Sequence, residues 1–197
     1  MPVTTLDPLA ALIVIDLQKG IVGLPTVHPA GEIVRRSAQL ARTFRGRGLP
    51  VVLINVTAAA PGRTDAGPRS FSFSNDWTEL VPELDQQPGD ILISKQRAGA
   101  FIGTELDEIL RERGVTQVFL TGVATGTGVE ATARSAADHG YNVVVVTDAI
   151  TDMDPEVHRF CIEKIFPRLA ETDTTENVLT LATRAEVSSA QDAEAPG

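Results

Sequence analysis

Two charged side chains stand at the ends of separate apolar runs and give the clearest chemical signal in this sequence. Asp16 lies near the end of the run ALIVIDL (11–17), and Lys95 closes the run DILISK (90–95). Either charge would be costly to bury alone, whereas a carboxylate and an ammonium group at one sheet edge can neutralise each other and set each other's pKa. The pattern fits a catalytic pair, a structural ion pair or two unrelated solvated strand ends.

A glycine-rich turn is the second chemical signal. The segment TGVATGTGV (121–129) leads directly into a predicted helix, whose first backbone N–H groups can hold an anion or a developing oxyanion. Turns of this composition also serve tight packing alone. The segment matches neither G-x-G-x-x-G nor the Walker pattern, so it does not indicate a nucleotide site.

Hydroxyl groups near this turn lack an evident activating base. Thr125 and Thr127 flank the glycines, but no histidine is recognisable near them, and serine-type activation needs one. His28 falls in a predicted loop. His158 falls in a late helix, where we expect it to make a structural hydrogen bond. We therefore predict that neither threonine acts as a nucleophile.

Alternating apolar runs and amphipathic stretches predict the frame that positions these groups. Predicted strands occupy residues 11–17, 50–56, 90–95, 117–123, 142–149 and, at an edge, 176–182; predicted helices occupy residues 31–48, 103–114, 127–140 and 154–169. Strands that are apolar throughout are buried on both faces, as in a parallel sheet between two helical layers. The sequence predicts an α/β fold with a doubly wound, mainly parallel six-stranded sheet, a Rossmann-like three-layer sandwich.

Ligands of such sheets bind beyond the carboxyl ends of the strands. This rule selects Asp16, Gln18, Asn55, Thr57, Lys95, Arg97, the segment 123–128 and Asp148. The Gly-, Pro- and Ser-rich segment 57–89, with a short helical piece near 75–84, belongs to the same rim. A connection of that length is usually functional and often forms a lid.

Composition and charge limit the classes of function. The 197 residues fit one domain at 1–183, followed by a tail of small and polar residues at 184–197 that we expect to be flexible. A formal net charge of -9 argues against a nucleic-acid partner and favours a small-molecule substrate. No apolar run reaches the roughly 18 residues of a membrane span, and the N-terminal segment does not have the pattern of a signal peptide. With a single cysteine, we expect a cytoplasmic protein.

Several spaced motifs resemble the isochorismatase-like hydrolase family, also called the cysteine hydrolase superfamily. They are IDLQ, KQRAGAFIGT, GVATGTGVEATARSA, TDAITD, EVH and IFPRL, in the family's order across roughly residues 10–181. In the amidohydrolase branch, an Asp, a Lys and a Cys nucleophile form the site. The resemblance assigns the first two roles to Asp16 and Lys95, but Gly128 occupies the position of the cysteine. Cys161 falls on the apolar face of a late helix, as a buried core residue would.

The resemblance therefore implies the branch that lacks the catalytic cysteine and cleaves a vinyl ether without a covalent intermediate. Asp16 would protonate the enol ether, and water would attack the resulting oxocarbenium-like carbon. This role requires a raised pKa for Asp16, and burial must then outweigh the opposing effect of Lys95. Two alternatives stay open: a catalytically inert binding protein that keeps the fold, and an amidase that acts by direct water attack.

The same resemblance and the rim position predict the substrate contacts. They are Gln18, Trp77, Arg97, Phe101, Ala124 and Thr125. Arg97 could hold a carboxylate in bidentate fashion, or lie solvated at the rim, and Phe101 could equally be a core residue. A cis peptide at Val123–Ala124 is common in the family and would aim the Ala124 and Gly128 amides into the pocket.

The resemblance also bears on cofactors and assembly. The nicotinamidase branch has an Asp-x-His cluster after the second strand, where this chain has Asn55, Val56 and Thr57. We therefore predict no metal and no other cofactor. Relatives are often dimers or tetramers, so we expect a homo-oligomer.

Overall fold

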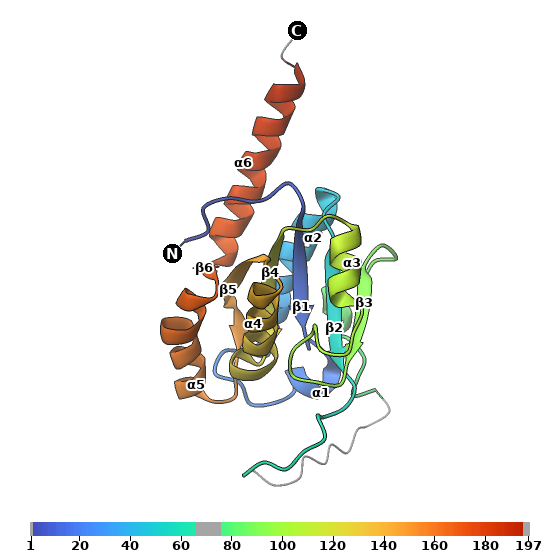
Figure 1. Ribbon diagram of the computed structural model, residues 1–197, viewed down its shortest axis with the longest axis vertical. Helices are drawn as coiled ribbons and strands as arrows, with labels where there is room; N and C mark the ends of the chain where they lie inside the picture. The colour runs from blue at the N-terminus through green and yellow to red at the C-terminus, as the bar shows by residue number, and fades with distance from the viewer. Residues whose placement is uncertain (1, 66–75, 195–197) are drawn as a thin grey trace.

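A parallel six-stranded sheet forms the centre of the computed structural model, which describes residues 2–65 and 76–194, the last ten as backbone only (Figure 1). The strands are β1 (Ala10–Ile15), β2 (Val51–Val56), β3 (Ile91–Lys95), β4 (Gln117–Val123), β5 (Asn142–Thr151) and β6 (Glu171–Asp173). Their spatial order is β3-β2-β1-β4-β5-β6, and every neighbouring pair is parallel. The predicted α/β fold class is confirmed.

Helices cover both faces of the sheet. They are α1 (Lys19–Val22), α2 (Ala30–Gly46), α3 (Leu106–Glu112), α4 (Glu130–Asp138), α5 (Pro155–Phe160) and α6 (Thr175–Glu194). Single π-helical turns span Thr125–Val129 and Cys161–Ile165, and 3-10 turns span Pro82–Leu84 and Phe166–Arg168. No helix among the described residues is both long and apolar enough to cross a bilayer.

The alternating side chains of β1 show the two layers. Leu12 and Val14 pack in one core cluster with residues of α2 and α6, whereas Ile13 and Ile15 pack in a second cluster with residues of α3 and α4. In Figure 1, α4 lies in front of the sheet and α2 behind it. A strand buried on both faces needs no polar alternation, which explains the continuous apolar run of the sequence.

The chain reverses its direction across the sheet at β1. It builds β2 and β3 on one side and then returns to place β4 on the other, so the crevice between β1 and β4 is the topological switch point. The two strands approach closely where Gly122 pairs with Ile15. Gly122 has φ +117°, and a Cβ there would lie 2.0 Å from the Ile15 carbonyl oxygen, so only glycine fits. The residues that follow β1 and β4 therefore leave the sheet side by side.

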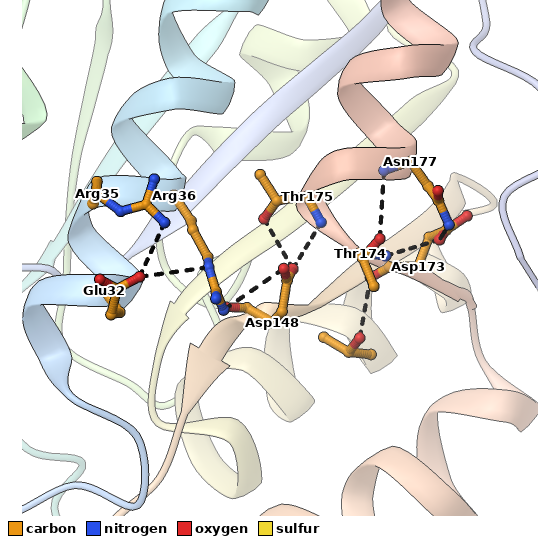
Figure 2. Close-up of polar contacts among 9 residues, drawn as sticks. Glu32, Arg35, Arg36, Asp148, Asp173, Thr174, Thr175 and Asn177 are labelled. Carbon is orange, nitrogen blue, oxygen red and sulfur yellow. Dashed lines mark hydrogen bonds and ion pairs between the residues drawn. The ribbon is translucent and has the colours of Figure 1, made fainter.

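The predicted sixth strand at 176–182 is wrong. Those residues lie in α6, and the sixth strand is the shorter β6. Figure 2 shows why a helix begins here: Asp148 Oδ1 accepts hydrogen bonds from the Thr175 backbone N–H (2.7 Å) and hydroxyl (2.9 Å). Val178 and Ala182, four residues apart, are buried in the cluster that contains α2. A short apolar run has no periodicity that separates a strand from a buried helix turn.

The same observation reassigns Asp148. Arg36 forms an ion pair with its Oδ2 (3.6 Å) and also donates a hydrogen bond to its carbonyl oxygen, so Asp148 links α2, β5 and α6 (Figure 2). Strand-end position made Asp148 a candidate for ligand binding, but its carboxylate is already used by the protein. We conclude that it stabilises the start of α6.

Two other predicted segments differ in length from expectation. The helix α6 continues to Glu194, so most of the segment predicted as a tail is helical. The short helical piece predicted near 75–84 is a 3-10 turn at Pro82–Leu84, and Asn75 lies outside the described residues. Of the predicted lid, residues 66–75 are outside the description as well.

Candidate active site

Asp16 and Lys95 meet beyond the carboxyl edge of the sheet. Asp16 directly follows β1 in a left-handed conformation (φ +53°), and Lys95 ends β3, with β2 between them. Lys95 Nζ donates a hydrogen bond to Asp16 Oδ2 at 2.8 Å and another to the Arg97 carbonyl oxygen at 3.2 Å. Asp16 is 5% exposed and Lys95 2%. The pair is thus held inside the protein, as the strand-end rule suggests.

The second oxygen of Asp16 is chemically free. Oδ1 is buried and has no hydrogen-bond partner among the described residues. Burial raises the pKa of Asp16 to about 6, and the neighbouring Lys95 opposes this rise without cancelling it. The effect of desolvation on this pKa is therefore larger than that of the ion pair, and the carboxyl group can take up or release a proton near neutral pH.

A cavity of about 390 Å³ opens beside this pair. Its polar part includes Asp16, Lys95, Arg97 and Thr127. Its apolar wall includes Ile21, Leu24, Val56, Ala98 and Met153, together with Ala58, Ala59 and Ala60 from the segment after β2. The cavity has the size and the mixed lining of a small-molecule site.

Gly128 lies next to the Asp16 carboxylate. A Cβ built on it would be 3.3 Å from Asp16 Oδ2 and 3.1 Å from both Ile15 Cγ2 and the Val123 carbonyl oxygen. Its φ lies outside the left-handed range, so the backbone itself does not demand glycine. A side chain at this position would point at the acid. The glycine leaves that space open to the cavity.

The turn before Gly128 has the geometry that the resemblance implies. The Val123–Ala124 peptide bond is cis, and both residues line the cavity. Ala124 caps the π-helical turn Thr125–Val129, which leads into α4. The predicted start of the helix at 127 therefore falls inside this wider turn, and α4 itself begins at Glu130.

Gln18 is not placed at the cavity. Its side chain is fully buried, with Nε2 donating to the carbonyl oxygens of Val56 and Trp77 (3.1 Å each) and Oε1 accepting from the Val56 N–H at 2.8 Å. The amide thus ties the end of β1 to β2 and to the segment before β3. Gln18, predicted as a substrate contact, instead makes three hydrogen bonds to the backbone.

The two predicted aromatic contacts also lie elsewhere. Phe101 is 7% exposed and packs in the core, with its ring centroid 5.3 Å from that of His139 and 5.9 Å from that of Tyr141. The Trp77 ring covers Gly20, where a Cβ would lie only 2.0 Å from Trp77 Cδ1. Neither residue lines the cavity. Both rings pack against other parts of the protein. The position of an aromatic residue in the sequence does not show whether its ring packs in this way or contacts a ligand.

Thr125 has a histidine partner, contrary to expectation. Its hydroxyl lies 2.8 Å from His158 Nδ1, and both side chains are buried. The two residues are 33 positions apart, so only the fold brings them together. The predicted structural hydrogen bond of His158 is confirmed, whereas Thr125, predicted as a substrate contact, is not among the residues that line the cavity.

Sequence reasoning missed Asp152. The predicted strand stops at 149, but β5 continues to Thr151, and Asp152 follows it. Asp152 Oδ2 accepts a hydrogen bond of 2.7 Å from the Gly126 N–H, at the start of the π-helical turn. The acid in the TDAITD motif was the available signal. Within the described ranges, no group of three or more His, Cys, Asp or Glu side chains is placed to hold a metal ion.

Comparisons with known proteins identify the family of this chain. The Isochorismatase domain model matches residues 10–177. The chain is 39% identical over 176 residues to the uncharacterized isochorismatase family protein YwoC of Bacillus subtilis, covering 86% of this chain and 92% of that protein. It is 30% identical over 215 residues to the ureidoacrylate amidohydrolase RutB of Methylobacterium radiotolerans, covering 91% and 83%.

A solved structure shares the fold closely. An isochorismatase family protein from Burkholderia thailandensis superimposes with a TM-score of 0.88 at 41% identity, over 91% of this chain and 98% of that one. The family model spans all six strands and the helices α1 to α5, and the relatives match over most of their own length. This chain belongs to the isochorismatase family of hydrolases.

Proposed function

We propose that this protein hydrolyses a small molecule without a covalent enzyme intermediate, with Asp16 as the acid–base group and Lys95 as its electrostatic partner. One observation carries the proposal: Lys95 holds one oxygen of a buried carboxyl group with a raised pKa, while the other oxygen has no partner among the described residues. Gly128 adjoins that carboxyl group and offers no nucleophile, so attack by a protein sulfur at this position is excluded.

The proposed reaction is the hydrolysis of a vinyl ether. Protonated Asp16 gives its proton to the terminal carbon of the double bond, and the ether carbon becomes oxocarbenium-like. Water adds to that carbon, and the hemiketal breaks down to a ketone and an alcohol. Lys95 stabilises the carboxylate that remains after proton transfer. Water is the only co-reactant that this reaction consumes.

Two groups are proposed to hold the substrate. Arg97 lines the cavity and has no carboxylate partner among the described residues. While Asp16 is ionised it neutralises Lys95, and Arg97 leaves the cavity with one uncompensated positive charge inside a chain of net charge -9. When Asp16 is protonated for the reaction, the ammonium group of Lys95 adds a second positive charge. This favours an anionic substrate. The backbone N–H groups of Ala124 and Gly128 are the proposed site for an anionic group of the substrate.

An amidase that acts by direct water attack is the second candidate, since the relative RutB is a ureidoacrylate amidohydrolase. There ionised Asp16 would take a proton from water. A catalytically inert binding protein is the third, because of the missing side chain at Gly128. A cytoplasmic location stays a prediction from the single cysteine, and a dimeric or tetrameric assembly stays a prediction from the resemblance.

The experiment is a panel of vinyl ethers, amides and esters, each with and without a carboxylate, assayed at high enzyme concentration beside ligand-induced thermal stabilisation. Turnover of carboxylated vinyl ethers is the expected result. Turnover restricted to amides would replace the proposal with the second candidate. Strong stabilisation by several compounds without any turnover would replace it with the third.

The pH dependence of kcat/KM shows whether Asp16 acts as an acid or as a base. Asp16, whose pKa is about 6, is protonated below that pH and ionised above it. If Asp16 donates the proton, kcat/KM is at its maximum at low pH and falls about tenfold per pH unit above 6. If Asp16 accepts a proton from water, kcat/KM rises with pH and levels off above 6. We expect the falling profile, and a rising one would contradict the vinyl-ether mechanism.

Filling the space beside Asp16 tests the role of Gly128. Gly128→Ala adds one methyl group about 3.3 Å from the reacting carboxylate, so we expect kcat/KM to fall about tenfold with little loss of Tm. Gly31→Ala is the matched control, because nothing lies within 4 Å of the added methyl group there. Equal activities of the two variants would show that substrate does not approach Gly128.

A further inference from the structure

A clamp outside the cavity holds the turn Thr125–Val129. On one side, Asp152 Oδ2 accepts from the Gly126 N–H at 2.7 Å, and the Thr125 hydroxyl contacts His158 Nδ1 at 2.8 Å. On the same side, Val157 packs so closely that a Cβ on Gly126 would lie 2.1 Å from its Cγ1. These three contacts with the segment 152–158 thus hold Thr125 and Gly126, the first two residues of the turn.

The end of this turn forms the wall of the proposed active site. Thr127 and Gly128 line the cavity, and the position of a Gly128 side chain is 3.3 Å from Asp16 Oδ2. Only two residues separate Thr125 from Gly128, so a shift of Thr125 is transmitted to the cavity wall. Asp16 itself comes from β1 and does not contact the segment 152–158 through any hydrogen bond of the described residues. The distance between acid and wall therefore depends on the clamp.

We propose that His158 is a positioning residue, which through its hydrogen bond with Thr125 fixes the turn at Ala124 and Gly128 relative to Asp16. The inference rests on the function proposed above. Neither His158 nor Thr125 lines the cavity, so a direct role in proton transfer or nucleophilic attack is excluded for both in this geometry. Their hydrogen bond is fully inside the protein, where its loss leaves a polar atom without a partner.

The surroundings of His158 favour its neutral form. Burial lowers its pKa, the neighbouring His28 lowers it further, and Asp152 opposes both. The His28 ring lies edge-on, with its centroid 5.0 Å away. A neutral imidazole keeps Nδ1 available as a hydrogen-bond acceptor for the Thr125 hydroxyl at neutral pH. The hydrogen bond between His158 and Thr125 is therefore made by an uncharged imidazole.

The test uses Thr125→Val, which removes the hydroxyl at nearly constant volume, and Thr125→Ser, which restores it. Thr121→Val is the matched control, because the Thr121 hydroxyl is equally buried on β4 but has no hydrogen-bond partner among the described residues. With a substrate from the panel, we expect Thr125→Val to lower kcat about 10- to 100-fold with KM nearly unchanged. Thr125→Ser should recover most of the activity, and Thr121→Val should match the wild type.

A second readout does not depend on catalysis. Each variant is combined with Gly128→Cys, and the alkylation rate of the introduced thiol by iodoacetamide is measured against the background of buried Cys161. That thiol is crowded by Ile15 and Val123, so we expect Thr125→Val to release it and speed alkylation several-fold, and Thr125→Ser not to. This result stands even if Asp16→Asn retains full turnover, which would refute only the proposed function.

Unchanged alkylation and unchanged kcat in Thr125→Val would overturn the proposal, as would effects equal to those of Thr121→Val. If Thr125→Val does not fold, the pair His158→Asn and His158→Leu replaces it. Asparagine can place a polar atom near the position of Nδ1, whereas leucine cannot. We expect activity with the first and a loss with the second, and equal behaviour of the two would refute the role of His158.

Discussion

Turnover should fall by at least about 100-fold when Asp16 is replaced by asparagine, because the amide can neither donate nor accept the proton that the reaction needs. The substitution keeps the shape of the side chain. It also suits the backbone, because asparagine tolerates the left-handed conformation found at Asp16. The variant should therefore fold, and kcat/KM measured on the best substrate of the panel gives the loss.

Asp90→Asn is the matched control for this experiment. Asp90 is also a buried aspartate with a cationic partner, Arg45, at 2.7 Å, but it lies outside the cavity. Its replacement should lower stability and leave kcat/KM unchanged. Undiminished turnover in Asp16→Asn, or an equal loss in both variants, would remove Asp16 from the chemistry.

Replacing Lys95 with methionine should lower the free energy of unfolding by about 3–5 kcal/mol at pH 8, since a buried carboxylate then loses its cationic partner. The loss should shrink as the pH falls. Without Lys95 the folded-state pKa of Asp16 rises above its present value of about 6, which is already above the ordinary pKa of an aspartate. A carboxyl group with a raised folded-state pKa stabilises the fold only while protonated, so stability falls as pH rises through that window.

Urea midpoints between pH 5 and pH 8 measure this effect. The double variant Asp16→Asn/Lys95→Met carries neither charge and should recover much of the stability lost at pH 8, with little dependence on pH in this range from the pair. A loss in Lys95→Met that is the same at pH 5 and pH 8 would show that Asp16 does not titrate in this site.

The parts of the site that the sequence predicts are those governed by strand ends. Continuous apolar runs require a sheet buried on both faces, and parallel strands present their carboxyl ends at one edge. Asp16 and Lys95 follow from these two rules, and so does the glycine-rich turn beside them. Gly128 as the site of a missing nucleophile comes from the family resemblance and not from periodicity.

The remaining contacts depend on which way a side chain turns, and strand position does not determine this. Gln18 and Arg97 both stand at strand ends, yet one is used up by backbone hydrogen bonds and the other faces the cavity. Phe101 could bury its ring in the core or against a ligand with the same hydrophobic gain. The Thr125–His158 contact joins residues 33 positions apart and leaves no local signal. Such pairs become visible only when the helices are packed.

The order of the strands also has a consequence for how this scaffold can diversify. Both members of the ion pair come from the portion of the chain that ends with β3, whereas the turn that forms part of the cavity wall comes from β4 onward. Exchanging the latter portion between relatives would alter the shape and polarity of the cavity wall. Asp16 and Lys95 would stay together, because both lie in the portion that is not exchanged. Recombination at the connection between β3 and α3 could thus change substrate specificity while Asp16 is retained as the acid.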